Sequence, residues 1–196
     1  MQLSAIRTAI STEVELSLSP TALTQLVNRA VRKIAAERDW PWLELTETGT
    51  WGSGETITMD ATAKAVKSVV VDDRRYDPLA EQDTDTQAGQ LLSTGFSVAA
   101  RQLRVVPQPA ATATYTLWYV AYENELTADA DEPLIPDAFI DAVVMLACSM
   151  AHDRPAGNTR ARDNFNERYR ELRKDMIGSA AAKRGAQLPR MRQDVI

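Results

Sequence analysis

The feature that most constrains this chain is a change of hydrophobic period along its length. Towards both ends, apolar residues recur every three or four positions, which is typical of amphipathic helices. Between residues 43 and 125, β-branched and aromatic residues alternate around short polar turns, which is typical of strands. The order therefore predicts two helices, a β-rich stretch, two more helices and a tail.

The helix expected near residues 20–39 has the clearest boundaries. Ser19 is a favoured N-cap residue and Pro20 suits the first turn of a helix. Pro41 disfavours a helical conformation for the residue before it, so the helix should end there. The same period predicts further helices near 3–14, 136–152 and 159–177, the last of them closed by Gly178 as a C-cap.

Within the β-rich stretch, the polar pair Asp72 and Asp73 predicts the turn of a hairpin. The strongest strand signal spans residues 112–123, where apolar or aromatic side chains occupy both faces. A strand that is apolar on both faces is buried on both sides. This segment therefore predicts either a central strand or a subunit interface.

These elements lead us to predict an α+β fold. It consists of an α-helical bundle of about four helices, a β-rich insertion between the second and third helices, and an extended C-terminal arm. The helices should form one bundle because their apolar stripes must be buried against something. The expected domains are residues 1–42 and 126–178 for the bundle, 43–125 for the insertion and 179–196 for a flexible basic arm.

Charge is unevenly distributed, although the net charge is only −5. Residues 1–153 contain 11 basic and 22 acidic side chains, whereas residues 154–196 contain 11 basic and 5 acidic ones. The C-terminal segment should therefore meet an acidic partner, either protein or nucleic acid, while the body repels polyanions. The longest apolar run, residues 142–148, is far shorter than the roughly 20 residues of a membrane span, so no membrane association is expected.

No pattern for catalysis, metal binding or cofactor binding is present. The single cysteine, Cys148, and the single histidine, His152, exclude an intrachain disulfide and most metal sites. Residues 52–54 (GSG) lack the other residues of a dinucleotide or phosphate loop. The acidic segment 129–132 lacks the glycine and the later glutamate of a calcium loop. We therefore expect no enzyme activity, no cofactor and no metal.

Two tryptophans, Trp40 and Trp42, flank Pro41 directly after a predicted helix. They could form a stacking platform for single-stranded nucleic acid. Alternatively, they close the end of the core at the junction of the bundle and the β-rich part, as large aromatic residues often do. We predict the second role.

Several segments follow one another in a distinctive order. They are 38–44 (RDWPWLE), 69–79 (VVVDDRRYDPL), 103–107 (LRVVP), 115–122 (YTLWYVAY), 126–133 (LTADADEP) and 135–139 (IPDAF). Taken in this order, they resemble the head-to-tail adaptor (connector) proteins of short-tailed and related tailed bacteriophages, and the similarity spans roughly residues 19–177.

The resemblance implies a structural virion protein at the head-tail junction, made in the cytoplasm of the host bacterium. Such adaptors form a ring, usually of about twelve copies, beneath the portal. Their helical part builds the ring, their β-rich part faces the tail nozzle or tube, and their C-terminal segment docks into the portal protein. Genome DNA passes through the ring without sequence-specific binding.

The predicted portal-docking residues are the basic and apolar side chains near the C-terminus: Lys183, Arg184, Leu188, Arg190, Met191, Arg192, Val195 and Ile196. Two other classes of function remain open. A small DNA-binding module could use the basic tail, although the acidic body and the lack of a recognition helix count against it. A small enzyme or enzyme subunit would need a polar constellation that the sequence does not show.

Overall fold

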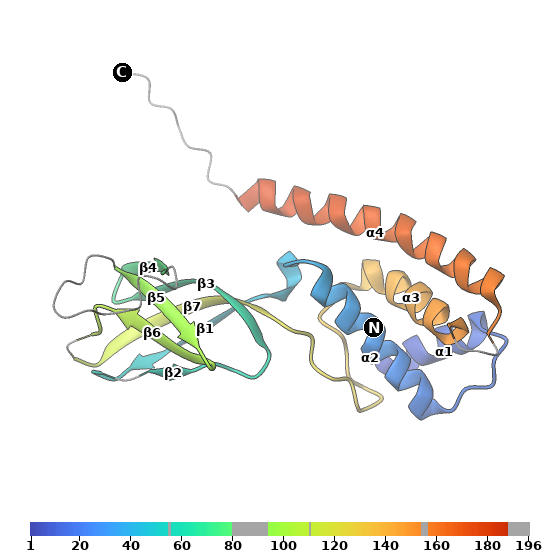
Figure 1. The fold of residues 1–196 in the computed structure, drawn as a ribbon, viewed down its shortest axis with the longest axis horizontal. Coiled ribbons are helices and arrows are strands. Elements are labelled where there is room, and N and C mark those ends of the chain that lie inside the picture. Colours follow the sequence, from blue (N-terminus) through green and yellow to red (C-terminus); the bar gives the residue numbers. More distant parts are fainter. Residues whose placement is uncertain (55, 80–93, 110, 154–156, 188–196) are drawn as a thin grey trace, which may run out of the picture. The chain divides into compact units, whose positions relative to one another are not determined.

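The computed structural model describes residues 1–54, 56–79, 94–109, 111–153 and 157–187, with side chains as far as Lys183. The chain divides into two compact units. The helical unit contains Met1–Trp42 and Glu123–Ile196, and the sheet unit contains Leu43–Tyr122. Figure 1 shows the elements of each unit.

The helical unit is organised around one central, buried helix. Its elements are α1 (Leu3–Glu13), α2 (Pro20–Glu37), the short 3-10 turns η1 (Pro41–Leu43, which continues into the sheet unit) and η3 (Asp137–Phe139), α3 (Ile140–His152) and α4 (Thr159–Gln187). Helix α3 packs against α1, α2 and α4, and nearly all of its residues are buried. A helix that is apolar on all sides requires such surroundings. No helix in the described part of the chain is long and apolar enough to cross a membrane.

The predicted start of α2 is confirmed. The hydroxyl oxygen of Ser19 accepts a hydrogen bond from the Ala22 backbone N–H at 3.2 Å, and Pro20 is the first helical residue. The helix ends at Glu37, four residues before Pro41. Local capping chemistry was therefore sufficient to predict this element.

In the sheet unit, the described strands form one seven-stranded sheet of barrel-like curvature. Their order is β1-β7-β3-β4-β5-β6-β2. The strands are β1 (Glu44–Trp51), β2 (Ile57–Thr58), β3 (Ala63–Val71), β4 (Arg74–Pro78), β5 (Gly95–Ala99), β6 (Gln102–Val106) and β7 (Ala113–Ala121). Strand β7 pairs with β1 on one side and β3 on the other, so it is a central strand, one of the two predicted alternatives. The expected burial of both faces is wrong, because Thr114 and Trp118 on its outer face are exposed.

The predicted hairpin joins β3 to β4. Asp72 and Asp73 form its turn, and both have positive φ angles of 44° and 64°. Aspartate tolerates this left-handed region better than most residues. The Asp72 carboxylate also accepts a hydrogen bond from the Thr114 backbone N–H at 2.8 Å, which ties the turn to the start of β7.

The prediction of an α-helical bundle that carries a β-rich insertion is wrong. The strands bury their apolar faces on one another, in a core that includes Trp51, Val69, Leu103 and Leu117. The sheet is therefore a compact unit with its own core, and the helices surround α3 rather than forming a bundle with a small insertion. Alternation identified the strands, but it could not show that their inner faces pack against each other.

The prediction that an extended arm begins at residue 179 is also wrong, at least as far as Gln187. Helix α4 continues through Gly178, which lies inside the helix and not at its end. A glycine inside a helix costs about 1 kcal/mol relative to alanine. The three alanines that follow favour the helix, and Ala180 is almost completely buried, so packing offsets that cost. Residues 188–196 lie outside the described residues.

Candidate interaction surfaces of the helical unit

Trp40 and Trp42 stack on each other within the helical unit. Their ring centroids are 4.6 Å apart with an interplanar angle of 16°, and Trp42 also packs against Phe139. Trp40 is completely buried, and its indole N–H donates to the Ile34 carbonyl oxygen at 2.7 Å. A buried ring offers no face to a nucleic-acid base, so Trp40 does not form a stacking platform. The role of the pair in closing a junction with the β-rich part stays a prediction.

Asn28 of α2 fastens the segment that follows the sheet unit. Its side-chain amide donates to the Leu126 carbonyl oxygen at 2.8 Å, and its amide oxygen accepts from the Leu126 N–H at 2.9 Å. Both residues are buried. Asn28 therefore supplies both hydrogen bonds that a neighbouring strand would otherwise supply. Nothing in the helical pattern of α2 had singled out this residue.

Glu123 is a buried carboxylate at the start of this returning segment. One of its oxygens accepts a hydrogen bond from the Leu134 backbone N–H, and the other has no partner among the described residues. Burial raises the pKa of Glu123, and the hydrogen bond from Leu134 offsets this only in part. The charged form is therefore disfavoured in the folded protein.

We expect Glu123→Gln to flatten the dependence of stability on pH. Because the folded pKa of Glu123 is raised, its neutral form stabilises the fold below the ordinary value of 4.5, and this contribution is lost as the pH rises through the folded pKa. The glutamine cannot ionise and keeps an acceptor for Leu134. Chemical denaturation between pH 4 and pH 8 should show an unfolding free energy at neutral pH equal to or above that of the wild type. A variant that is less stable than the wild type at neutral pH contradicts this account, and Glu123→Ala, which removes the acceptor, provides the comparison.

The acidic segment 129–132 is used for local structure. The Asp131 carboxylate accepts hydrogen bonds from the Thr127 and Ala128 backbone N–H groups, and these bonds lower its pKa. Asp129 pairs with Arg7 of α1. The described residues contain no group of three potential metal ligands. The Asp131 carboxylate therefore organises the loop itself, and the Asp129 carboxylate attaches the loop to α1.

Cys148 and His152 lie one turn apart on α3, and both are buried. Burial raises the pKa of the Cys148 thiol to about 12, so the thiolate needed for nucleophilic chemistry is not formed at neutral pH. The His152 ring stacks on Phe165 of α4 with ring centroids 5.8 Å apart. His152 therefore contributes to the packing between α3 and α4, and Cys148 is part of the buried core.

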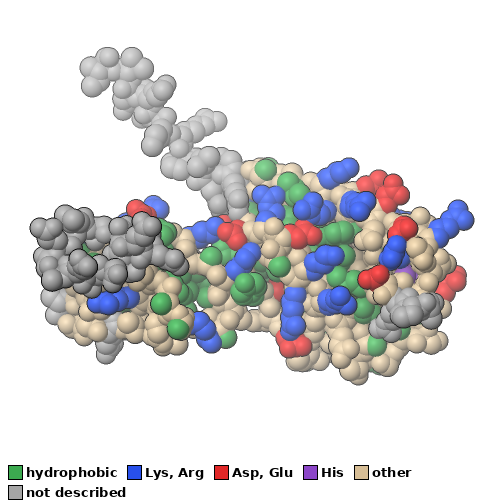
Figure 2. All heavy atoms as spheres, viewed as in Figure 1, with side chains coloured by type: hydrophobic (Ala, Val, Ile, Leu, Met, Phe, Trp, Pro, Cys, Tyr) green, Lys and Arg blue, Asp and Glu red, His purple; other side chains and the backbone are tan. Residues whose placement is uncertain are grey.

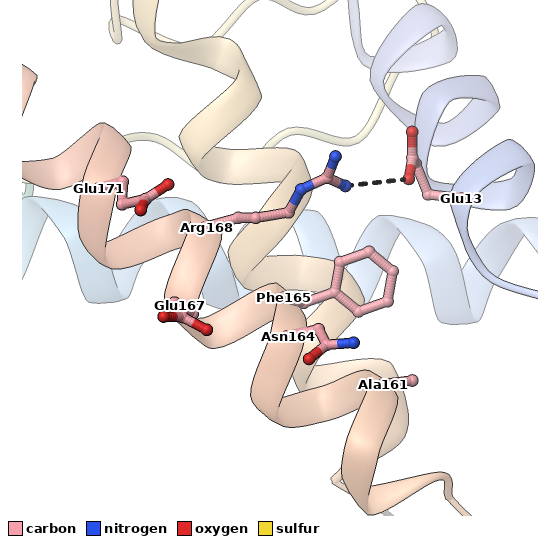
Figure 3. A pocket seen from close by; sticks show the side chains of 7 residues that line it. All are labelled: Glu13, Ala161, Asn164, Phe165, Glu167, Arg168 and Glu171. Carbon is pink, nitrogen blue, oxygen red and sulfur yellow. Dashed lines mark ion pairs between the residues drawn. The ribbon is translucent and has the colours of Figure 1, made fainter.

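A first groove lies between the end of α1 and the first half of α4, with a volume of about 480 Å³. It is lined by Glu13, Ala161, Asn164, Phe165, Glu167, Arg168 and Glu171. Figure 3 shows Phe165 and Arg168 extending from α4 towards Glu13, with Arg168 3.8 Å from the Glu13 carboxylate. Glu167 and Glu171 are exposed and make no ion pair with another described residue, so this side of α4 is acidic.

A second groove, here named the basic groove, runs between α2 and α4 over α3, with a volume of about 350 Å³. It is lined by Lys33, Leu146, Ser149, Met150, Asp153, Arg162, Asp163, Asn166 and Arg170. Arg162 pairs with Asp153 and Asp163. Lys33 and Arg170 are exposed and have no ion-pair partner in the described part of the chain. Figure 2 shows Lys and Arg side chains gathered over α2 and α4 on the face turned to the viewer.

Helix α4 is joined to α2 beside the basic groove. The Tyr169 hydroxyl donates to one oxygen of Glu37 at 2.8 Å, and the Arg173 guanidinium donates to the other. Burial and the hydrogen bond to Glu37 raise the pKa of Tyr169, so its hydroxyl stays protonated. These contacts hold the two walls of the groove together.

Only a small part of the predicted docking set lies within the described residues. Lys183 is exposed on the last turns of α4. Arg184 is in the same helix, but its side chain is not described. The other predicted docking residues, namely Leu188, Arg190, Met191, Arg192, Val195 and Ile196, lie outside the described residues.

The sequence prediction missed both grooves because each combines residues from distant parts of the chain. Glu13 and Glu167, or Lys33 and Arg170, meet only after the helices pack. One local signal was available, since like charges recur every four residues along α4.

Comparison with known proteins assigns the chain to a family. The family model described as SU10 adaptor protein matches residues 1–193. No curated protein matches the chain. The match covers nearly the whole sequence and includes both units, which confirms the resemblance found from the order of segments. The chain belongs to the SU10 adaptor protein family, a family of phage head-to-tail adaptors.

Proposed function

We propose that this phage adaptor protein forms a ring that joins the portal to the tail and lines part of the DNA conduit. The observation that supports this most directly is the family match over residues 1–193. The acidic character of residues 1–153 is consistent with a conduit, because a lumen that neutralised many phosphates would bind the genome and slow its passage. The role is structural, without catalysis.

The proposed partners are the portal protein, a nozzle or tube protein of the tail, and other copies of the chain. A ring of about twelve copies requires a head-to-tail contact that closes on itself. The protein would be made in the cytoplasm of the host bacterium and would reside in the virion at the head-tail junction. It would have no contact with a membrane.

Residues 188–196 form the proposed portal-docking arm, together with Lys183 and Arg184. The segment combines apolar side chains with Arg190 and Arg192, a composition suited to an apolar groove with an acidic rim. Basic charge would steer the arm towards an acidic portal surface and make early association sensitive to salt. Because α4 continues to Gln187, the arm is shorter than the sequence alone indicated.

Deleting residues 188–196 tests this function. We expect the truncated protein to keep its melting temperature, because α4 and its buried Ala180 remain, and to bind purified portal at least about tenfold more weakly. A version that replaces the same nine positions with glycine and serine controls for chain length. If the truncated protein binds portal with unchanged affinity, the arm is not the docking element.

A small DNA-binding module that uses the basic tail is the second candidate function. The unpaired Lys33 and Arg170 of the basic groove favour it, whereas the net charge of −5 does not. An electrophoretic shift assay at several salt concentrations separates the two functions. Tight DNA binding that is lost on deletion of residues 188–196, without any binding to portal, would support the DNA-binding module.

A further inference from the structure

Helix α4 carries two stripes of like charge. Its acidic stripe consists of Asp163, Glu167, Glu171 and Asp175, which are spaced four residues apart. Its basic stripe consists of Arg162, Arg170 and Lys174, which follow the same spacing with Asn166 at the remaining position. Like charges four residues apart on a helix repel each other and slightly destabilise it. Opposite charges three residues apart, such as Glu167 and Arg170, favour a helix, but neither that pair nor Glu171 and Lys174 forms an ion pair in the described part of the chain.

Contacts within the molecule neutralise only the beginning of the two stripes. Arg162 pairs with Asp163 at 2.9 Å and with Asp153 at 3.5 Å. Further along α4, Glu167, Glu171, Arg170 and Lys174 are all exposed, and none has an ion-pair partner among the described side chains. Two carboxylates on the acidic stripe and two cations on the basic stripe therefore remain available to another molecule.

The two stripes lie beside different grooves. Glu167 and Glu171 border the groove shared with α1, whereas Arg170 faces Lys33 of α2 across the basic groove. The lining of the basic groove is mostly polar, and its two carboxylates, Asp153 and Asp163, are paired with Arg162. The basic groove thus presents two unpaired cations, and the neighbouring stripe of the same helix presents unpaired carboxylates.

We propose that the acidic stripe of one copy lies against the basic groove of a second copy. Glu167 and Glu171 of the first copy would pair with Arg170 and Lys33 of the second. A twofold contact of either surface with itself would bring like charges together, whereas a head-to-tail contact joins opposite charges. This inference rests on the proposed function, because a repeated head-to-tail contact is what a closed ring requires.

Charge reversal on each side of the contact provides the test. One variant carries Lys33→Glu and Arg170→Glu, and a second carries Glu167→Arg and Glu171→Arg. Sedimentation velocity at about 50 mM salt measures self-association, and we expect each variant to associate at least about tenfold more weakly than the wild type. Arg104→Glu, at an exposed position in β6, is the control for a change of charge elsewhere and should associate normally.

Mixing the two variants distinguishes a head-to-tail contact from a general effect of charge. In a 1:1 mixture every junction again joins opposite charges, so association should return to within about threefold of the wild type. The variant with all four substitutions should recover in the same way on its own. If either reversed variant associates like the wild type, or if the mixture is not restored, the proposal is wrong.

The same measurements on purified portal separate this inference from the proposed function. Copies loaded per portal can be counted by mass photometry. If the inference alone fails, the reversed variants load portal to the wild-type number. If portal docking fails, no variant loads, whatever its self-association. A wild-type chain that neither self-associates in solution nor loads portal cooperatively overturns the proposed contact.

Discussion

Trp40→Ala is expected to destabilise the helical unit by about 3–5 kcal/mol, as large-to-small substitutions of buried tryptophans typically do. The indole is completely buried and stacks on Trp42. Its N–H also satisfies the Ile34 carbonyl in the last turn of α2, one of the groups that a helix end leaves without an intrahelical partner. Chemical denaturation followed by circular dichroism at 222 nm reports the loss.

Two further variants divide this effect into its parts. Trp40→Phe keeps most of the apolar volume but removes the N–H donor, so it should cost about 1–3 kcal/mol. Trp42→Ala should cost less than Trp40→Ala, because the Trp42 side chain is only partly buried and its N–H has no partner among the described residues. If Trp42→Ala leaves melting unchanged and abolishes binding of single-stranded DNA, the stacking role would have to be reconsidered for Trp42.

Asn28→Ala is expected to cost about 2–4 kcal/mol, because it leaves two buried backbone groups without partners. Both the N–H and the carbonyl oxygen of Leu126 bond to the Asn28 side chain, and Leu126 is only 3% exposed. Thermal melting and limited proteolysis near residue 126 should both report the change, since the returning segment loses its attachment to α2.

Asn28→Asp is the matched variant for this prediction. The carboxylate still accepts from the Leu126 N–H but faces the Leu126 carbonyl oxygen without a proton to donate. Its pKa should therefore be raised in the folded state, so the variant should regain stability as the pH falls and the carboxyl group becomes protonated. If Asn28→Ala changes the unfolding free energy by less than about 1 kcal/mol, the two hydrogen bonds between Asn28 and Leu126 are not important for stability.

Local chemistry explains which elements could be predicted. Ser19 and Pro20 define the start of α2, and Asp72 and Asp73 define the turn between β3 and β4, because capping and turn formation depend on neighbouring residues. The end of α4 was predicted at Gly178 by the same kind of rule, and there the rule failed. Burial of Ala180 outweighed the local preference of glycine for a helix end.

Of the candidate interaction surfaces, too, some could be predicted from the sequence and others could not. The charge imbalance and the apolar residues near the C-terminus could be seen in the sequence, and they led to the proposed docking arm. The basic groove could not be predicted, since Lys33 of α2 and Arg170 of α4 are brought together only by packing against α3. The same holds for Asn28, whose partner Leu126 lies 98 positions away in the chain.

The sequence by itself determined the type and order of most elements and excluded most cysteine and histidine chemistry, because periodicity and residue chemistry are local properties. Only the tertiary structure decided how the apolar faces are buried. The strands pack on one another around Trp51 and Leu117, and the helices pack around α3, so the chain forms two compact units in place of one bundle with an insertion. The sequence shows that an apolar face must be buried. Which other element covers that face depends on which surfaces fit together in three dimensions.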